Sequence, residues 1–220
     1  MALPEVQERA IEIFNILDRE YPNAGPTINF SNPFELLIAS MIGARATDES
    51  VNRTTKFLFK KYPTPKNLAV ADYDTLVEEI HDVGLADVKA HYIIETSKLL
   101  LEKHGGQVPC SMKELTDLPG VGRKIANMVL GNACGQPAMI VDTHVNRVSL
   151  RLRLTTSANP TIAERELKQV LPEECWTRWN FLMIAHGRRI CVARNPKCSI
   201  CPVLRLCPYG TRRMMDLPPV

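Results

Sequence analysis

The sequence LTDLPGVGRKIANMVL at residues 115–130 predicts the end of one apolar helix, a tight hairpin and a second helix that begins at Arg123. Gly120 and Gly122 allow the backbone of the hairpin to approach another molecule closely, because glycine lacks a Cβ. Free amides at the start of the second helix form a site for a phosphate group, which suits contact with a nucleic-acid backbone without reading of its sequence. An ordinary turn between two helices can have the same composition. The stretch alone leaves both interpretations open.

The remainder of the chain also carries helical signals. Apolar residues recur at helical spacing from Leu3 to Leu17, and no segment alternates as a strand would, so we predict an all-α fold. Glycine predicts two helix ends, at Gly84 and, after a helix from about Asp87 to His104, at Gly105. Three stretches resemble the capping boxes that begin helices: Asn32-Pro33-x-Glu35, Ser111-x-x-Glu114 and Thr161-x-x-Glu164.

Four of the seven cysteines lie in one C-terminal stretch, Cys191-x6-Cys198-x2-Cys201-x5-Cys207. Four thiolates in one loop can hold tetrahedral zinc or an iron–sulfur cluster. Structural zinc sites favour two close pairs of cysteines. Here only one pair is close, so the spacing favours a cluster.

The other interpretation of these four cysteines is a pair of disulfides. The chain opens with MALPEVQERA and no apolar signal stretch, so we expect a reducing, cytoplasmic compartment in which disulfides are rare. We interpret the remaining cysteines, Cys110, Cys134 and Cys175, as isolated and buried small apolar residues.

Length and charge limit the possible functions. With 220 residues, 45% of them hydrophobic, the chain can bury a core, and no apolar run approaches the length of a membrane span. Residues 1–100 hold 10 Lys/Arg against 15 Asp/Glu, whereas residues 101–220 hold 17 against 9. The stretch 187–213 contains seven Lys/Arg and no acidic residue. Such a basic patch is typical of a protein that binds a polyanion, although anionic thiolates would attract some of these cations too.

Three motifs in order resemble one known family. LPGVGRK at residues 118–124 is followed, 18 residues after Lys124, by Asp142 in VDTHVNR, and then by the cysteine loop. This arrangement is similar to the endonuclease III branch of the helix-hairpin-helix DNA glycosylases, over essentially the whole chain. The resemblance implies two helical lobes with a DNA-binding cleft between them. A six-helix barrel domain with the helix-hairpin-helix would span residues 23–134, and a domain around a [4Fe–4S] cluster would join 1–22 to 135–220.

The resemblance also implies a reaction, whose chemistry the residues permit. Lys124 lies in the first turn of a helix, where the positive end of the helix dipole disfavours the ammonium form. A neutral amine can attack the sugar of a deoxynucleotide, expel the base and form a Schiff base that breaks the strand by β-elimination. Asp142 would stabilise positive charge on the sugar and relay protons. The other interpretations are a phosphate-binding lysine and an aspartate that caps a helix.

Other positions match parts of the family that contact DNA. Leu85 matches an apolar wedge that fills the gap left by an extruded nucleotide, although a leucine at such a place is more often in the core. Arg45 stands where the family carries glutamine, and arginine only donates hydrogen bonds whereas glutamine donates and accepts. We interpret Asp48 and His144 as capping or supporting residues. The residues expected to contact DNA are Arg45, Leu85, Gly120, Gly122, Arg123, His144, Arg147, Arg194 and Lys197.

The sequence therefore predicts a bifunctional DNA glycosylase and AP lyase that removes oxidised pyrimidines from duplex DNA in base-excision repair. We expect a cytoplasmic monomer, associated with the nucleoid if the source is bacterial, that acts on DNA with a damaged base or abasic site. A mismatch glycosylase on the same scaffold is the alternative enzyme. A catalytically silent DNA-binding or redox-sensing protein is the alternative from another class, but binding alone requires neither Lys124 nor Asp142.

Overall fold

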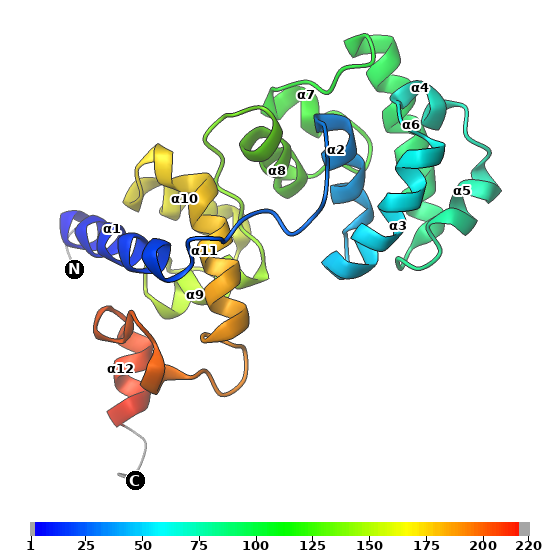
Figure 1. The fold of residues 1–220 in the computed structure, drawn as a ribbon. Helices are drawn as coiled ribbons and strands as arrows, with labels where there is room; N and C mark the ends of the chain where they lie inside the picture. The colour runs from blue at the N-terminus through cyan, green and yellow to red at the C-terminus, as the bar shows by residue number, and fades with distance from the viewer. Residues whose placement is uncertain (1–2, 216–220) are drawn as a thin grey trace. The chain divides into compact units, whose positions relative to one another are not determined.

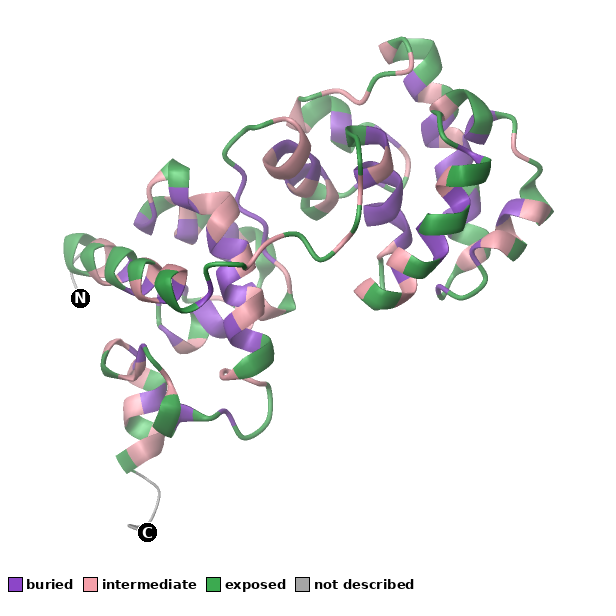
Figure 2. Ribbon diagram, viewed as in Figure 1, coloured by how far each residue is buried: buried purple, intermediate pink, exposed green. Residues whose placement is uncertain are grey.

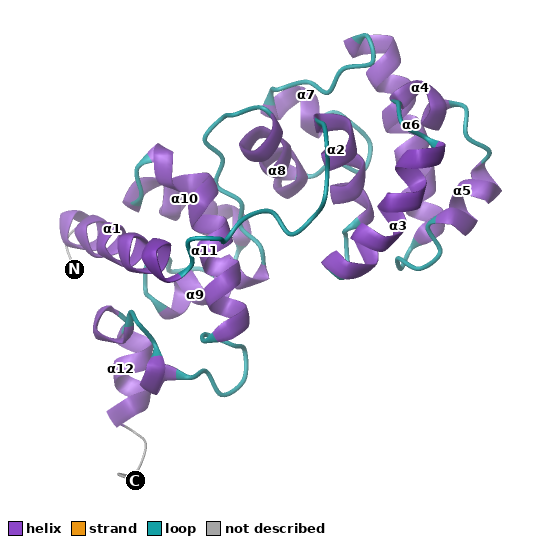
Figure 3. Ribbon diagram, viewed as in Figure 1, coloured by secondary structure: helices purple, strands orange, loops and turns teal. Residues whose placement is uncertain are grey.

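The computed structural model describes residues 3–215, which form helices and loops with no strand among them (Figure 3). This confirms the predicted all-α class. The chain divides into a discontinuous unit, Met1–Gly25 with Pro137–Val220, and a continuous unit, Pro26–Gln136. The division expected from the resemblance, after residues 22 and 134, lies close to these boundaries. No helix in residues 3–215 is long and apolar enough to cross a membrane.

The continuous unit is built around α2 and α6. Almost every residue of α2 is buried (Figure 2), because its sequence PFELLIASMI is apolar on all faces and can only be accommodated inside. The long helix α6 contacts α2, α4 and α5, and α8 contacts α2 and α7. We expected six helices in this domain, and the structure has seven, two of them only five residues long (Figure 1): α2 (Pro33–Ile42), α3 (Asp48–Lys61), α4 (Pro65–Ala69), α5 (Tyr73–Glu79), α6 (Ala86–His104), α7 (Met112–Thr116) and α8 (Arg123–Ala133).

The discontinuous unit brings the N-terminal helix onto the C-terminal third of the chain. Ile13 and Leu17 of the first helix are fully buried in the same core as Trp179, and α9 contacts α11 extensively. The apolar stripe at helical spacing from Leu3 to Leu17 explains this burial. The helices are α1 (Leu3–Glu20), α9 (Thr143–Arg151), α10 (Pro160–Val170), α11 (Trp176–Arg189) and α12 (Pro208–Met215), with short 3-10 helices at Glu173–Cys175, Cys198–Ile200 and Leu204–Leu206.

Local sequence explains many helix starts. Asn32 accepts a hydrogen bond from the Glu35 amide at 2.9 Å, and the Glu35 carboxylate accepts one from the Ser31 amide at 2.7 Å. The Ser111 hydroxyl caps α7 by accepting a hydrogen bond from the Glu114 amide at 3.5 Å. Gly105 ends α6 in the left-handed conformation. These three predictions are confirmed.

Two helix boundaries differ from the prediction. Asn159, not Thr161, caps α10, because its side chain accepts hydrogen bonds from the Thr161 and Ile162 amides and Pro160 then occupies the first turn. Glu164 is buried and pairs with Lys168 at 3.0 Å. Helix α5 ends at Glu79, so Gly84 lies in the following turn and does not end that helix.

The interpretation of Cys110 and Cys134 as isolated and buried residues is wrong. They form a disulfide, with Cys110 exposed and Cys134 half-buried. Helices α7 and α8 contact each other, so the chain returns on itself between them. Cys110, directly before the residue that caps α7, therefore lies beside Cys134, which caps the end of α8. The side chain of Gln136 also donates to the Cys110 carbonyl, at 2.8 Å. The disulfide thus closes the base of the segment that contains α7, the hairpin and α8, whereas Cys175 is buried and unbridged, as expected.

Reduction of this disulfide is expected to destabilise the protein. The two cysteines are 24 residues apart, and a crosslink across a loop of that length contributes about 3 kcal/mol by restricting the unfolded chain. For a protein of this size, the loss lowers Tm by about 5–10 °C. Circular dichroism melting with and without a phosphine reductant measures the shift. Cys110→Ser is the control: its Tm should not respond to the reductant, and an equal response would assign the effect to another group.

Candidate active site and metal centre

The hairpin between α7 and α8 is seated on α6. Gly120 has a φ of +75°, and a Cβ there would lie 2.9 Å from the Tyr92 side chain, so only glycine fits. The Thr96 hydroxyl donates to the Pro119 carbonyl at 2.8 Å. Gly122 caps α8 with extended backbone and open space around it. The two glycines therefore serve different needs: Gly120 allows close packing on α6, and Gly122 leaves the start of α8 accessible.

Lys124 lies in the first turn of α8 and is exposed, as is its neighbour Arg123. That first turn contains no acidic residue. The amides of a helix start carry partial positive charge, so the hairpin, the helix start and two cations present a surface suited to an anion. The amine of Lys124 is accessible to a substrate at this place.

Asp142 caps α9 and is half-buried. Its Oδ1 accepts a hydrogen bond from the Val145 amide at 2.7 Å, so the capping role predicted as an alternative is present. One carboxylate oxygen is thereby fixed in place. Asp142 belongs to the discontinuous unit and Lys124 to the continuous unit; their meeting at the mouth of a cleft stays a prediction.

His144 and Arg147, on the first turns of α9, are half-buried. Arg147 donates to the Cys191 carbonyl at 3.2 Å, the Gly187 carbonyl at 3.0 Å and His144 Nδ1 at 3.2 Å. A Cβ on Gly187 would lie 2.8 Å from His144 Nδ1, so α11 passes very close to these side chains. DNA contact by the two residues stays a prediction; their observed partners give them a role in holding the cysteine loop.

Arg45 and Leu85 share an unusual backbone. Their φ angles are +59° and +66°, and both side chains are exposed, Leu85 by 53%. The two loops are joined through the start of α3: the Ser50 hydroxyl donates to the Asp82 carbonyl at 3.3 Å, and Arg53 pairs with the Asp82 carboxylate at 3.2 Å. The alternative that Leu85 belongs to the core is wrong.

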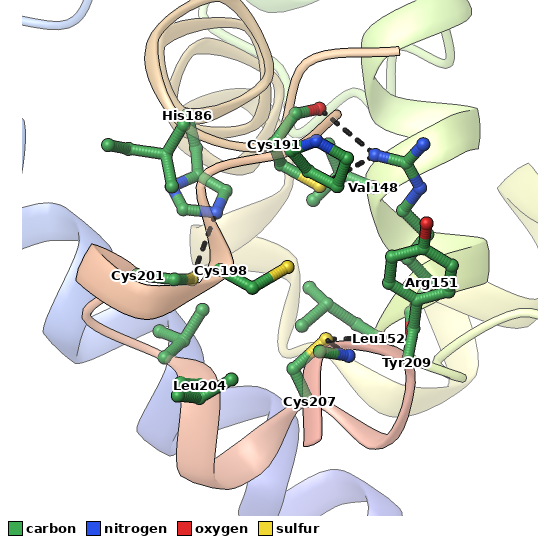
Figure 4. A pocket seen from close by; sticks show the side chains of 14 residues that line it. Val148, Arg151, Leu152, His186, Cys191, Cys198, Cys201, Leu204, Cys207 and Tyr209 are labelled. Atoms are coloured by element: carbon green, nitrogen blue, oxygen red, sulfur yellow. Dashed lines mark hydrogen bonds between the residues drawn. The ribbon is translucent and has the colours of Figure 1, made fainter. Parts of the chain in front are cut away.

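The four C-terminal cysteines line one pocket of the discontinuous unit (Figure 4). None of them is disulfide-bonded. Apolar residues complete the walls, among them Val148, Leu152 and Val203. Within residues 3–215 no three Cys, His, Asp or Glu side chains converge closely enough for a single metal ion; the four sulfurs face a shared cavity instead. An all-thiolate donor set around a cavity fits an iron–sulfur cluster.

Arg151 anchors the start of the cysteine loop. Its guanidinium donates to the carbonyls of Val192 and Ala193, both at 2.8 Å, and to the carbonyl and Sγ of Cys191, both at 3.4 Å (Figure 4). The guanidinium lies 4.8 Å from the centre of the Tyr209 ring. Arg151 thus supplies one positive charge beside the sulfurs and satisfies carbonyls that form no part of a helix. Arg151 was not among the residues predicted for the site, although its spacing of four from Arg147 places both on one helix face.

The other sulfurs also have polar partners. The Gly210 amide donates to Cys207 Sγ at 3.3 Å, and Cys201 Sγ lies 3.6 Å from His186 Nε2. Burial raises the pKa of the Cys201 thiol to about 11 and lowers the pKa of His186 to about 4. A thiolate in this pocket therefore depends on bound cations, and iron would supply them.

Arg194 and Lys197 lie on the exposed segment between Cys191 and Cys198. Asn195 between them has a φ of +51°, and its side chain accepts a hydrogen bond from Arg213 at 3.4 Å. The segment therefore presents two cations at the surface. Contact of these cations with phosphates stays a prediction.

Comparison with known proteins agrees with these features. Residues 38–173 match the family model of the HhH-GPD superfamily base excision DNA repair proteins, and residues 191–207 match the iron–sulfur binding domain of endonuclease III. The chain belongs to the endonuclease III family. Endonuclease III of Synechocystis is 41% identical over 92% of this chain and 93% of its own length, and that of Escherichia coli K12 is 40% identical over 91% and 95%.

A solved structure of a trapped endonuclease III–DNA covalent intermediate matches with a TM-score of 0.88 and 39% identity, covering 94% of this chain and 98% of that one. As a member of the endonuclease III family, the chain is a DNA-binding base-excision repair enzyme of the glycosylase/lyase type. Its cofactor is a [4Fe–4S] cluster, for which Cys191, Cys198, Cys201 and Cys207 have the donor set and the shared cavity. The spacing of the four cysteines predicted them as ligands, whereas no pattern in the sequence pointed to Arg151 or His186 beside them.

Proposed function

We propose that this endonuclease III relative removes oxidised pyrimidines from duplex DNA and cleaves the strand, with Lys124 as nucleophile. The observation that carries the proposal is an exposed lysine in the first turn of α8, directly after a hairpin with accessible amides. The hairpin and helix start bind phosphates on either side of the lesion. The enzyme acts as a monomer in the cytoplasm, at the nucleoid if the source is bacterial.

The reaction begins with the neutral amine of Lys124. The amine forms a bond to C1′ of the damaged nucleotide, and the glycosidic bond breaks with its electron pair leaving on the base, which takes up a proton. The sugar ring then opens to an imine between C1′ and Nζ. Loss of the C2′ proton expels the 3′ phosphate by β-elimination, and water releases the lysine.

Asp142 supports these steps through its charge. Positive charge develops on the sugar as the base departs, and a carboxylate held by a helix start stabilises that charge without reorganisation. It also accepts the proton that Lys124 loses on attack. Because its Oδ1 is fixed by the Val145 amide, its position does not depend on the substrate.

Lys124→Gln should abolish both strand cleavage and the covalent complex that borohydride traps with DNA. Affinity for DNA should fall only slightly, since one charge is lost among many contacts. Gel analysis after borohydride reduction measures trapping, and fluorescence anisotropy measures affinity. Lys113→Gln removes an exposed lysine from α7 and should trap normally. Normal trapping by Lys124→Gln would assign the nucleophile to another amine.

Asp142 offers a pair of substitutions that separates charge from capping. Asn is as good an N-cap as Asp, so Asp142→Asn should keep Tm and slow base release, by about 100-fold or more. Asp142→Ala should slow base release as much and also lose about 1 kcal/mol of stability. Single-turnover kinetics and thermal melting measure the two effects. Wild-type base release by Asp142→Asn would leave the residue with the capping role alone.

Arg45 sets the preference for the base opposite the lesion. It presents only donors, which suit the O6 and N7 acceptors of guanine better than the edge of cytosine with its amino donor. Arg45→Gln should change the ranking of opposite bases and reduce the salt dependence of binding, with cleavage at an abasic site little altered. Single-turnover rates with all four opposite bases test this.

The control for net charge is Lys56→Gln, which removes an exposed lysine of α3 that takes no part in the contact between the two loops. It should reduce the salt dependence without changing the ranking. If Arg45→Gln behaves in the same way, Arg45 contacts the phosphate backbone and does not read the base.

A further inference from the structure

A buried chain of hydrogen bonds leads from α1 to one of the cluster ligands. The Tyr21 hydroxyl lies 3.0 Å from His186 Nδ1. His186 Nε2 in turn lies 3.6 Å from Cys201 Sγ (Figure 4). Tyr21 is 4% exposed and His186 2% exposed. The carbonyl of His186 also accepts hydrogen bonds from the Ile190 and Cys191 amides, at 2.9 and 2.8 Å. The histidine is therefore fixed both by its side chain and by the backbone that begins the cysteine loop.

The direction of these hydrogen bonds follows from the ligand chemistry. A cysteine bound to iron is a thiolate and has no proton to donate. The proton between His186 and Cys201 must therefore be on Nε2. A neutral imidazole carries one proton, so Nδ1 is an acceptor, and the Tyr21 hydroxyl must donate to it. Tyr21 thus selects the tautomer in which His186 donates to the sulfur.

We propose that Tyr21 and His186 form a relay that donates a hydrogen bond to the Cys201 thiolate and raises the reduction potential of the cluster. A donor near a ligating sulfur withdraws electron density and stabilises the more negatively charged, reduced cluster. The relay adds no net charge to the pocket, in contrast to Arg151, whose guanidinium donates to Cys191 Sγ. Tyr21 and His186 are positioning residues of the cluster. Their role is independent of the identity of the nucleophile, and it is tested without DNA.

If Tyr21 and His186 only packed against each other, substituting them would change the stability of the protein and not the reduction potential of the cluster. The two rings are 6.0 Å apart and tilted by 54°, so they also pack as an aromatic pair. Substitution by phenylalanine keeps most of that packing and removes the donor. The potential, and not the stability, therefore separates the two roles.

Protein-film voltammetry of the purified holoprotein measures the one-electron couple, with the electrode supplying the electron. His186→Phe should lower the potential by roughly 59 mV, the equivalent of a tenfold change in the equilibrium constant. Tyr21→Phe should shift it in the same direction by less, because the histidine keeps its proton but loses the partner that selects its tautomer. His186→Gln returns an N–H donor and should recover most of the shift.

Tyr209→Phe is the matched control, since it removes a phenol from the wall of the same pocket and keeps the ring beneath Arg151. Its potential should equal that of the wild type. Iron analysis should give about four irons per chain for every protein compared. If His186→Phe fails to retain iron, the reduction potential of Tyr21→Phe tests the relay in its place.

Two results would overturn the relay. The first is a wild-type potential in both fully loaded phenylalanine variants at positions 21 and 186. The second is an equal shift in Tyr209→Phe, which would assign the effect to general polarity in the pocket. A failure of Lys124→Gln to lose trapping would overturn the proposed nucleophile but would leave the relay untouched.

Discussion

The hydrogen bonds from α9 to the start of the cysteine loop are the interaction on which the metal centre depends. Arg147 and Arg151 lie one turn apart and donate to the backbone between residues 187 and 193. That backbone is irregular beyond α11 and runs from buried at Gly187 to half-buried at Cys191 and Val192. A carbonyl buried without a donor costs about 1–3 kcal/mol. The same helix begins at Asp142 and buries Val145 and Val148 in the core. One short helix therefore holds the candidate carboxylate at its start and the side chains that anchor the cysteine loop further along.

In the continuous unit, the hairpin before α8 is also an irregular segment that neighbouring residues must hold in place. If the start of α8 binds a phosphate, as we propose, the amides used for that contact cannot also stabilise the hairpin, and contacts on its other side hold it. Tyr92 and Thr96 of α6 receive the hairpin at Gly120 and Pro119, and the disulfide between Cys110 and Cys134 ties the ends of the segment. Lys124 is thus carried by a segment constrained at its tip and at its base. If Lys124 is the nucleophile, as we propose, this constraint reduces the conformational entropy that it loses on reaching its reacting atom.

Many helix ends and the four-cysteine pocket could be predicted from the sequence, because their signals are local. The cap at Asn32, the left-handed end at Gly105 and the spacing of the four cysteines each depend on residues near one another in the chain. Three features could not be predicted, because the residues that form them are far apart in the chain. The separation is 24 residues for the disulfide, 165 for the Tyr21–His186 contact and about 40 for the anchoring by Arg151. The error at Thr161 has another origin: two capping signals overlapped, and Asn159 before Pro160 offers the better geometry for the first turn.

Arg45 and Leu85 both adopt the left-handed backbone conformation, as Arg153 and Asn195 also do. A side chain in the left-handed conformation costs about 1–2 kcal/mol, and glycine or asparagine avoids most of that cost. An exposed leucine also forgoes the free energy of burial. The surrounding contacts, from Thr47 capping α3 to Arg53 on Asp82, hold the two loops, so the strain is imposed by the fold and is not relieved by a slight shift. Strain and exposure that coincide in a pair of linked loops are typical of residues kept for a partner. The partner that we propose for both side chains is the gap that an extruded nucleotide leaves in the duplex.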